Sequence, residues 1–353
     1  MIERILFINS LNLDFLQEVV FSGLYKIMGD KITEYPYKKN YYINMGYPYN
    51  ISFVNKKSEA NSFIKNIFSN WDCIIVGSCK KETLKIYHRM LLLNPKIKKI
   101  PSVLIDGGDS SDIGGDAERI FKRVSSIKTF SLIFKREMKE EKINNKIFSL
   151  SFAINRDTFS DFNNVDKKYN VFFAFRPTNK IREDIYNILK NNQENSIVHL
   201  ETGRAAPEPA KKKNGFAKRF LNRFTLKERS NIYQQFYLLK IPPDRYLEYM
   251  SKSLIGVSLP GAGFDTYRYW EIPAAKTLLL SLKPSIYIRN NFQDNRSCVF
   301  FNDKSEILPV IKHLLQNRNK IEDITARGYE HLTKYHTDIQ RANYILNIIN
   351  DYL

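Results

Sequence analysis

Along the chain, short apolar segments typical of buried strands alternate with segments that have the periodicity of amphipathic helices. Several short apolar runs have the length and composition of strands buried on both faces, at residues 5–8, 73–76, 103–105 and 132–134. Between them, apolar residues recur at helical spacing over residues 13–28 and 81–92. Strands that alternate with helices predict a parallel sheet covered by helices on both faces.

This alternation of strand and helix patterns is interrupted by a polar stretch, residues 155–169, which we interpret as a linker between two domains. The alternation then resumes. Further strands are predicted at residues 171–175, 254–259, 277–281 and 298–301, with helices at 182–189, 306–315, 321–335 and 338–353. We therefore expect an α/β fold of two tandem Rossmann-like, doubly wound domains. The first is expected to span residues 1–160 and the second residues 170–335. Residues 336–353 are expected to form a C-terminal helix that crosses back to the first domain.

Ligands of such sheets bind at the carboxyl ends of the strands, so the cleft between the domains is the expected active site. The start of the chain has no signal-peptide pattern, and no run of about 18 apolar residues would span a membrane. The three cysteines, Cys73, Cys79 and Cys298, lack metal-ligand spacing and are interpreted as reduced core thiols. Together these features predict a cytoplasmic protein.

The net charge of +18 has two interpretations. A basic surface attracts nucleic acid, anionic lipid or phosphate-bearing substrates, whereas an AT-rich coding sequence raises the lysine content without any such role. Residues 202–229 hold nine Lys or Arg and two Glu, with Phe216, Phe220 and Phe224 at every fourth position. This segment fits a basic amphipathic helix in peripheral contact with the inner membrane face. It equally fits a solvated insertion whose phenylalanines pack onto the domain.

The most informative stretch is SLPGAGFDTYRYWEIPAA, residues 258–275. A predicted strand ends in a loop with Gly261 and Gly263, and a helix begins near Asp265 or Thr266. Glycines let the backbone approach a phosphate, and a helix N-terminus offers it free N–H groups. Either Asp265 or Thr266 would alternatively serve only as the N-cap of that helix.

Arg268 and Glu271 are three residues apart and so share one face of the predicted helix. An arginine there would pair with a diphosphate, and a carboxylate would accept hydrogen bonds from ribose hydroxyls. An ordinary surface Arg–Glu pair is the alternative. Because the glycine loop, the helix start and this pair coincide at a predicted strand end, we favour a nucleotide site.

The run DTYRYWE, a strand ending in FFND and the terminal HTDIQRANYIL resemble the C-terminal half of GT-B glycosyltransferases. The likeness is to bacterial sugar transferases with a spore-maturation-protein-like C-terminal domain. More distantly, the chain resembles phage DNA β-glucosyltransferases, which share the R-x-W-E pattern. The resemblance covers roughly residues 170–350 and implies that Arg268 contacts the diphosphate and Glu271 the ribose. It also implies that the first domain lies on the acceptor side and the second on the nucleotide-sugar side. Many retaining GT-B enzymes carry a second Glu at the position of Gly263, so this departure favours inversion.

A second candidate site follows the strand at residues 101–105, where Asp106, Asp109 and Asp112 lie in a glycine-rich loop. Inverting transfer needs a base that takes the proton of the acceptor hydroxyl. A strand-end aspartate has this role in the phage enzymes, and the likeness makes Asp106 the first candidate and Asp109 the second. The alternative is that these carboxylates only cap turns.

Arg176 ends the first strand of the second domain, where a cation would neutralise the leaving diphosphate. The sequence contains no D-x-D pair, no two histidines at zinc-ligand spacing and no P-loop, so neither a metal nor a cofactor is expected. The nucleotide-diphosphate sugar is a substrate rather than a cofactor.

The sequence therefore predicts a metal-independent glycosyltransferase that acts on a cell-envelope polysaccharide, a lipid-linked glycan or a protein. Two alternatives stay open. A DNA-modifying glucosyltransferase would suit the positive charge, although no other feature points to DNA. A catalytically silent module of the same fold would bind nucleic acid or lipid without transferring sugar.

Overall fold

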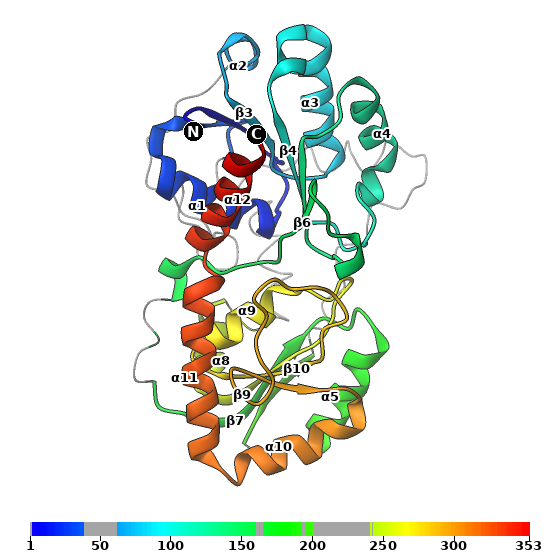
Figure 1. Cartoon of the computed structure of the whole chain (residues 1–353). Helices are drawn as coiled ribbons and strands as arrows, with labels where there is room; N and C mark the ends of the chain where they lie inside the picture. Colours follow the sequence, from blue (N-terminus) through cyan, green and yellow to red (C-terminus); the bar gives the residue numbers. More distant parts are fainter. Residues whose placement is uncertain are drawn as a thin grey trace, which may run out of the picture.

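The computed structural model of the chain describes residues 2–38, 62–159, 162, 165–192, 195–200, 241 and 243–353. These residues form two parallel sheets with helices packed on them, one above the other in Figure 1. This arrangement confirms the predicted class of two doubly wound α/β domains. The basic segment 202–229 lies outside the described residues, and the domain boundaries drawn from the sequence stay a prediction.

The first sheet has six strands in the order β2-β1-β3-β4-β5-β6, all parallel. In chain order the strands are β1 (Ile5–Ile8), β2 (Ile32–Tyr35), β3 (Cys73–Val76), β4 (Ser102–Asp106), β5 (Leu132–Lys135) and β6 (Ile147–Ser149). Helix α1 (Phe15–Met28) packs on one face, and the other face is covered by α2 (Phe63–Phe68), α3 (Lys81–Leu93) and α4 (Glu118–Ile127). The central strands are buried on both faces, which is why they appear in the sequence as unbroken apolar runs.

The second sheet has five parallel strands in the order β11-β10-β9-β7-β8. The strands are β7 (Tyr169–Phe175), β8 (Ile197–Leu200), β9 (Ser253–Ser258), β10 (Leu278–Leu282) and β11 (Val299–Phe301). One face packs against α5 (Lys180–Asn192), α10 (Ile307–Leu315) and part of α11 (Arg318–Tyr335). The other face packs against α8 (Pro243–Ser251), α9 (Tyr267–Ala274) and the rest of α11.

Three strands were not predicted from the sequence: β2, β6 and β8. All three lie at the edges of their sheets. Each has three or four residues and carries a polar one, as in the ITEY of β2. An edge strand has a neighbour on one side only, so its composition need not be uniformly apolar. In β2 the buried Glu34 is accommodated because its carboxylate accepts a hydrogen bond from the Asn9 side chain.

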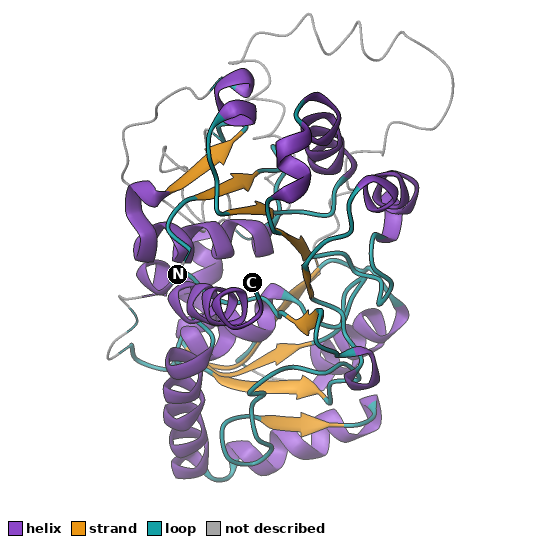
Figure 2. Ribbon diagram, turned by 45° about the horizontal axis from the view of Figure 1, so that its top comes forward, coloured by secondary structure: helices purple, strands orange, loops and turns teal. Residues whose placement is uncertain are grey.

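The last helix, α12 (Asp338–Tyr352), leaves the second sheet and packs beside α1 on the first, as Figures 1 and 2 show. Ala342, Ile345 and Ile349 are fully buried in the core of the first sheet. The two helices meet at Gly23, where a side chain would collide with the backbone of Asp338. The first hydrophobic core is therefore completed by residues from the far end of the chain.

Two segments cross between the sheets, and they are hydrogen-bonded to each other. The N–H of Ile154 donates to the carbonyl of His336 (3.1 Å), and the N–H of Asp338 donates to the carbonyl of Ile154 (2.8 Å). Buried Arg341 adds bonds to the carbonyls of Ser151 (3.0 Å) and Phe152 (2.9 Å). The HTDIQR stretch of the sequence thus joins both crossings into one unit.

Among the described residues, Cys73, Cys79 and Cys298 are free and buried, as predicted. No helix in this part of the chain is both long and apolar enough to cross a bilayer.

Candidate active site

The glycine loop between β9 and α9 is fixed by hydrogen bonds from side chains at the start of α5. The Asn179 amide donates to the carbonyls of Pro260 and Gly261, at 3.0 Å each. Buried Arg182 donates to the carbonyls of Pro260 (2.7 Å) and Leu259 (3.0 Å). A side chain at Gly261 would lie 3.2 Å from the Arg182 guanidinium. Gly261 therefore makes room for an arginine of the protein, a role that its sequence context did not indicate.

Arg176 lies beside this loop at the end of β7. Its side chain is exposed, and its carbonyl accepts a hydrogen bond from Arg182 at 3.2 Å. Its position at the carboxyl edge of the second sheet is the one expected from the sequence.

The loop also receives two charged residues from the first sheet. Arg136 and Glu137 follow β5, and both are buried. The Glu137 carboxylate accepts hydrogen bonds from the backbone N–H groups of Phe264 (3.1 Å) and Asp265 (2.9 Å). A side chain at Gly263 would collide with this carboxylate. The missing side chain at Gly263 thus gives a carboxylate of the other domain access to the loop.

Arg136 completes the same contact. Its guanidinium pairs with Glu137 at 3.0 Å and donates to the carbonyls of Asp265 and, at 3.0 Å, Gly107. It also pairs with Asp109. A single buried arginine therefore connects both candidate loops, one on each domain.

Asp265 belongs to this junction as well. Its carboxylate accepts hydrogen bonds from the Phe152 N–H and the Trp270 indole, both at 2.7 Å. Burial raises the pKa of Asp265 to about 6, against the opposing effect of Arg136. Thr266, not Asp265, occupies the N-cap position of α9, and its side chain makes no capping bond. In this structure Asp265 joins the domains, while Thr266 faces Ser258 at 3.4 Å.

Arg268 and Glu271 lie on one face of α9, as predicted, and Tyr246 of α8 connects them. The Arg268 Nε donates to the Tyr246 hydroxyl at 3.0 Å, and that hydroxyl donates to Glu271 Oε2 at 3.0 Å. Glu271 is buried, and burial raises its pKa to about 8. Tyr246 lies 25 positions from Glu271, so no local pattern indicated its part in this chain of hydrogen bonds.

Asp106 and Asp109 differ in environment although they are close in sequence. Asp106 is buried, accepts hydrogen bonds from the N–H groups of Gly108 and Gly114 at 2.9 Å each, and pairs with buried Lys135 at 3.2 Å. The Asp109 side chain is 57% exposed. Both line a pocket of about 480 Å³ at the carboxyl edge of the first sheet. Asp106 thus stabilises the turn that follows β4, which is the structural role given above as the alternative to a base. Asp109 is the more accessible carboxylate.

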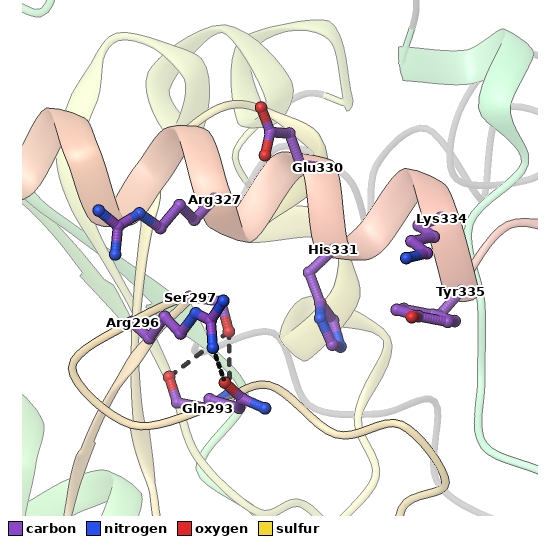
Figure 3. Close-up of a pocket in the computed structure, with 8 residues that line it drawn as sticks. All are labelled: Gln293, Arg296, Ser297, Arg327, Glu330, His331, Lys334 and Tyr335. Atoms are coloured by element: carbon purple, nitrogen blue, oxygen red, sulfur yellow. Dashed lines mark hydrogen bonds between the residues drawn. The ribbon is translucent and has the colours of Figure 1, made fainter.

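A further pocket of about 440 Å³ lies between α11 and residues 293–297, and it contains none of the predicted site residues. Figure 3 shows His331 on α11 pointing toward the Gln293 side of the pocket. His331 and His336 each lie 2.7 Å from the carbonyl of Asn290, which fixes the loop against α11. No sequence motif joins these positions.

We predict strong coupling between Gly263 and Glu137. Gly263→Ala should destabilise the protein because the new methyl group meets a buried carboxylate, and Glu137→Ala should destabilise it by removing two hydrogen bonds. In the Glu137→Ala background the Gly263→Ala change should be nearly neutral. Chemical denaturation of the four proteins should give a coupling free energy of roughly 1–3 kcal/mol. Additive effects would contradict the contact.

We also predict that Glu271 makes stability depend on pH. Its folded pKa of about 8 exceeds its ordinary value of 4.5, so its contribution is complete below pH 4.5 and is lost as pH rises through 8. Relative to Glu271→Gln, the wild-type free energy of unfolding should therefore fall between pH 5 and 9, on the order of 4 kcal/mol. Glu322→Gln, at an exposed position of α11, is the control. Parallel pH curves for wild type and Glu271→Gln would refute the assignment.

Comparisons with known proteins bear on the fold and on the C-terminal part of the chain. Residues 208–347 match the glycosyl transferase-like family model. HepE of Anabaena, solved with UDP-glucose, is similar over 99% of both chains, with a TM-score of 0.59 and 9% identity. An alpha-glucosyltransferase solved with UDP-glucose and DNA is similar over 98% of both chains, with a TM-score of 0.56 and 14% identity.

Sucrose-phosphate synthase from Thermosynechococcus elongatus is similar over 99% of this chain and 98% of its own, with a TM-score of 0.56 and 9% identity. No curated protein matches the sequence of the chain. The chain therefore has the fold of the GT-B glycosyltransferases, and its residues 208–347 match the glycosyl transferase-like family, which confirms the resemblance that the sequence indicated.

Proposed function

We propose that this protein transfers a sugar from a nucleotide-diphosphate donor to a hydroxyl of a cell-envelope polysaccharide, a lipid-linked glycan or a protein. The observation that carries the proposal is the buried Glu271 joined through Tyr246 to Arg268, on the helix that follows the glycine loop. A carboxylate held in this way is costly without a ligand, because burial disfavours its charged form. Ribose hydroxyls that donate to it would offset that cost.

The donor diphosphate is proposed to lie at the start of α9. The N–H groups of the first turn favour an anion there, and Arg268 and Arg176 supply positive charge on either side of the loop. Thr266, with no capping bond of its own, adds a hydroxyl. Gly261 and Gly263 contribute indirectly, because they let Arg182 and Glu137 fix the loop. These cations support transfer without a metal ion.

The proposed reaction is a single displacement. The acceptor oxygen attacks the anomeric carbon and gives its proton to a carboxylate, while the bond from that carbon to the diphosphate oxygen breaks. The diphosphate leaves with the bonding electrons, and Arg268 and Arg176 stabilise its charge. The position of the candidate carboxylates on the opposite domain from the donor helix supports this inverting geometry.

Asp109 is the stronger of the two candidate bases. Asp106 already accepts two N–H hydrogen bonds and pairs with Lys135, so it has little capacity left for a substrate. Asp109 keeps an exposed carboxylate on the same pocket, with Arg136 beside it. The choice can be tested because the two residues differ in what their loss does to the fold.

For the donor, we expect a thermal-shift screen of UDP-, GDP-, dTDP-, ADP- and CMP-sugars to find one that raises the melting temperature. Arg268→Ala should then weaken binding tenfold or more, since a charge-assisted contact contributes roughly 1.5–3 kcal/mol. Calorimetry in buffers of different ionisation enthalpy should also show proton release at neutral pH, because binding favours the charged form of Glu271. Arg245→Ala, at an exposed position of α8, is the control. Unchanged affinity of a folded Arg268→Ala protein would exclude this site.

For the base, we expect Asp109→Asn to lower turnover by about 10²–10⁴-fold. The melting temperature should change little, because Arg136 loses its pair with Asp109 but keeps its pair with buried Glu137. Asp106→Asn should instead lower the melting temperature, because it leaves the buried ammonium of Lys135 unpaired. Turnover is measured as release of nucleoside diphosphate from the donor found in the screen. The reverse pattern, with Asp109→Asn active and Asp106→Asn stable but inactive, would make Asp106 the base.

A further inference from the structure

Helices α2 and α3 lie at the part of the first domain that is farthest from the second sheet in Figure 1. Together they carry four exposed large apolar side chains. On α2, Ile64 and Phe68 are 68% and 69% exposed, and their i, i+4 spacing places them on one face. At the last turn of α3, Leu92 and Leu93 are 60% and 54% exposed. Single exposed leucines are ordinary, but four large side chains on two adjoining helices form a patch.

Two contacts tie these helices together. The Asn94 side chain, just after α3, donates to the carbonyl of Ile67 in α2 at 2.7 Å. The Arg89 guanidinium of α3 lies 5.2 Å from the ring centre of Phe63 in α2. Figures 1 and 2 show the two helices side by side from both directions. The four apolar side chains therefore belong to one surface, which we call the α2–α3 surface.

Positive charges predominate around this patch. Cations lie on α2, on α3 and on the short helix Pro95–Lys99 that follows it, namely Lys65, Lys85, Arg89, Lys96, Lys98 and Lys99. Residues 62–71 and 83–105 contain no Asp or Glu. Exposed Asp72 follows the first of these ranges, and its carboxylate accepts hydrogen bonds from the backbone N–H groups of Glu3 and Arg4. None of the five lysines forms an ion pair within the part of the chain that the structure describes. Elsewhere on the same domain, Lys122 of α4 pairs with Glu118 at 2.6 Å.

We propose that the α2–α3 surface binds an anionic lipid bilayer. Exposed Phe, Ile and Leu side chains insert at the level of the headgroups, and a rim of lysines meets the negative surface potential. Lysine stems can extend along the apolar patch while their ammonium groups reach the phosphates. The apolar side chains would thus contact the lipid chains, and the lysines would contact the lipid phosphates, of the same bilayer.

Two other kinds of partner would each match either the cations or the apolar side chains of this surface, but not both. A duplex nucleic acid would pair with the lysines but would leave Phe68 and Leu93 without an apolar partner. A second copy of the chain would cover the apolar side chains but would bring two sets of six cations together. A bilayer that contains acidic lipid satisfies both sets of groups.

The orientation follows from the fold. The end of α2 precedes β3 and the end of α3 precedes β4, so the α2–α3 surface lies at the amino edge of the first sheet. The candidate active site lies at the carboxyl edge. Docking at the α2–α3 surface leaves the pocket lined by Asp106 and Asp109 open to the aqueous phase. The proposal does not depend on the sugar-transfer function, because it uses none of the candidate site residues.

The test is co-sedimentation of the full chain with vesicles of phosphatidylcholine, with and without phosphatidylglycerol. We expect binding only to the vesicles that contain phosphatidylglycerol, and weaker binding at high salt. Replacing Lys96, Lys98 and Lys99 by Gln should weaken it on the order of a hundredfold, from roughly fivefold per lysine. The matched control carries Lys190→Gln, Lys283→Gln and Lys312→Gln, three exposed positions of the second domain, and should bind as wild type does.

The apolar contribution is tested by Phe68→Ser with Leu93→Ser, which should weaken binding roughly tenfold per side chain without a change in melting temperature. Leu11→Ser with Leu13→Ser, at exposed leucines elsewhere on the domain, is the control. The proposal is overturned by absent vesicle binding, or by binding lost only when Phe216, Phe220 and Phe224 are replaced by Ser. Duplex DNA retention or dimerisation that these α2–α3 substitutions abolish, without any vesicle binding, would overturn it equally.

Discussion

The contact of Arg136 and Glu137 with the glycine loop is the interaction on which the geometry of the site depends. A buried ion pair is costly because both charges leave water. Here the cost is offset, since the carboxylate accepts from two backbone N–H groups and the guanidinium donates to two backbone carbonyls. These bonds form in one arrangement of the domains only. The pair therefore specifies where the glycine loop lies relative to the pocket lined by Asp106 and Asp109.

The same contact occupies some of the backbone N–H groups of the loop, so only the others are available to a ligand. The N–H groups of Phe264 and Asp265 already face a carboxylate of the protein. A phosphate would therefore meet the loop one turn later, where α9 begins and Arg268 projects. A carboxylate of the first domain thus occupies two N–H groups of the loop, and the proposed diphosphate would have only the remaining ones.

Local patterns in the sequence were sufficient for the central strands, the start of α9 and the shared face of Arg268 and Glu271. Each of these depends on residues a few positions apart. The partners from distant segments were not predictable: Tyr246 between Arg268 and Glu271, Arg182 against Gly261, and Glu137 against Gly263. The glycines were interpreted as room for a phosphate, and the structure fills that room with side chains. The resemblance likewise ranked Asp106 before Asp109 as the base. Their difference in burial, which makes Asp109 the more accessible carboxylate, is not visible in a local pattern.

The position of α12 has a consequence for how the chain is made. Ala342, Ile345 and Ile349 complete the core of the first sheet, yet the ribosome adds them after every strand of the second. A nascent first domain therefore emerges with the α1 side of its sheet partly bare, and it waits in that state while the second domain is synthesised. Domains usually fold in the order of their synthesis. Here the earlier domain closes last, so its exposed apolar face would be the place where a chaperone or an aggregating neighbour meets the growing chain.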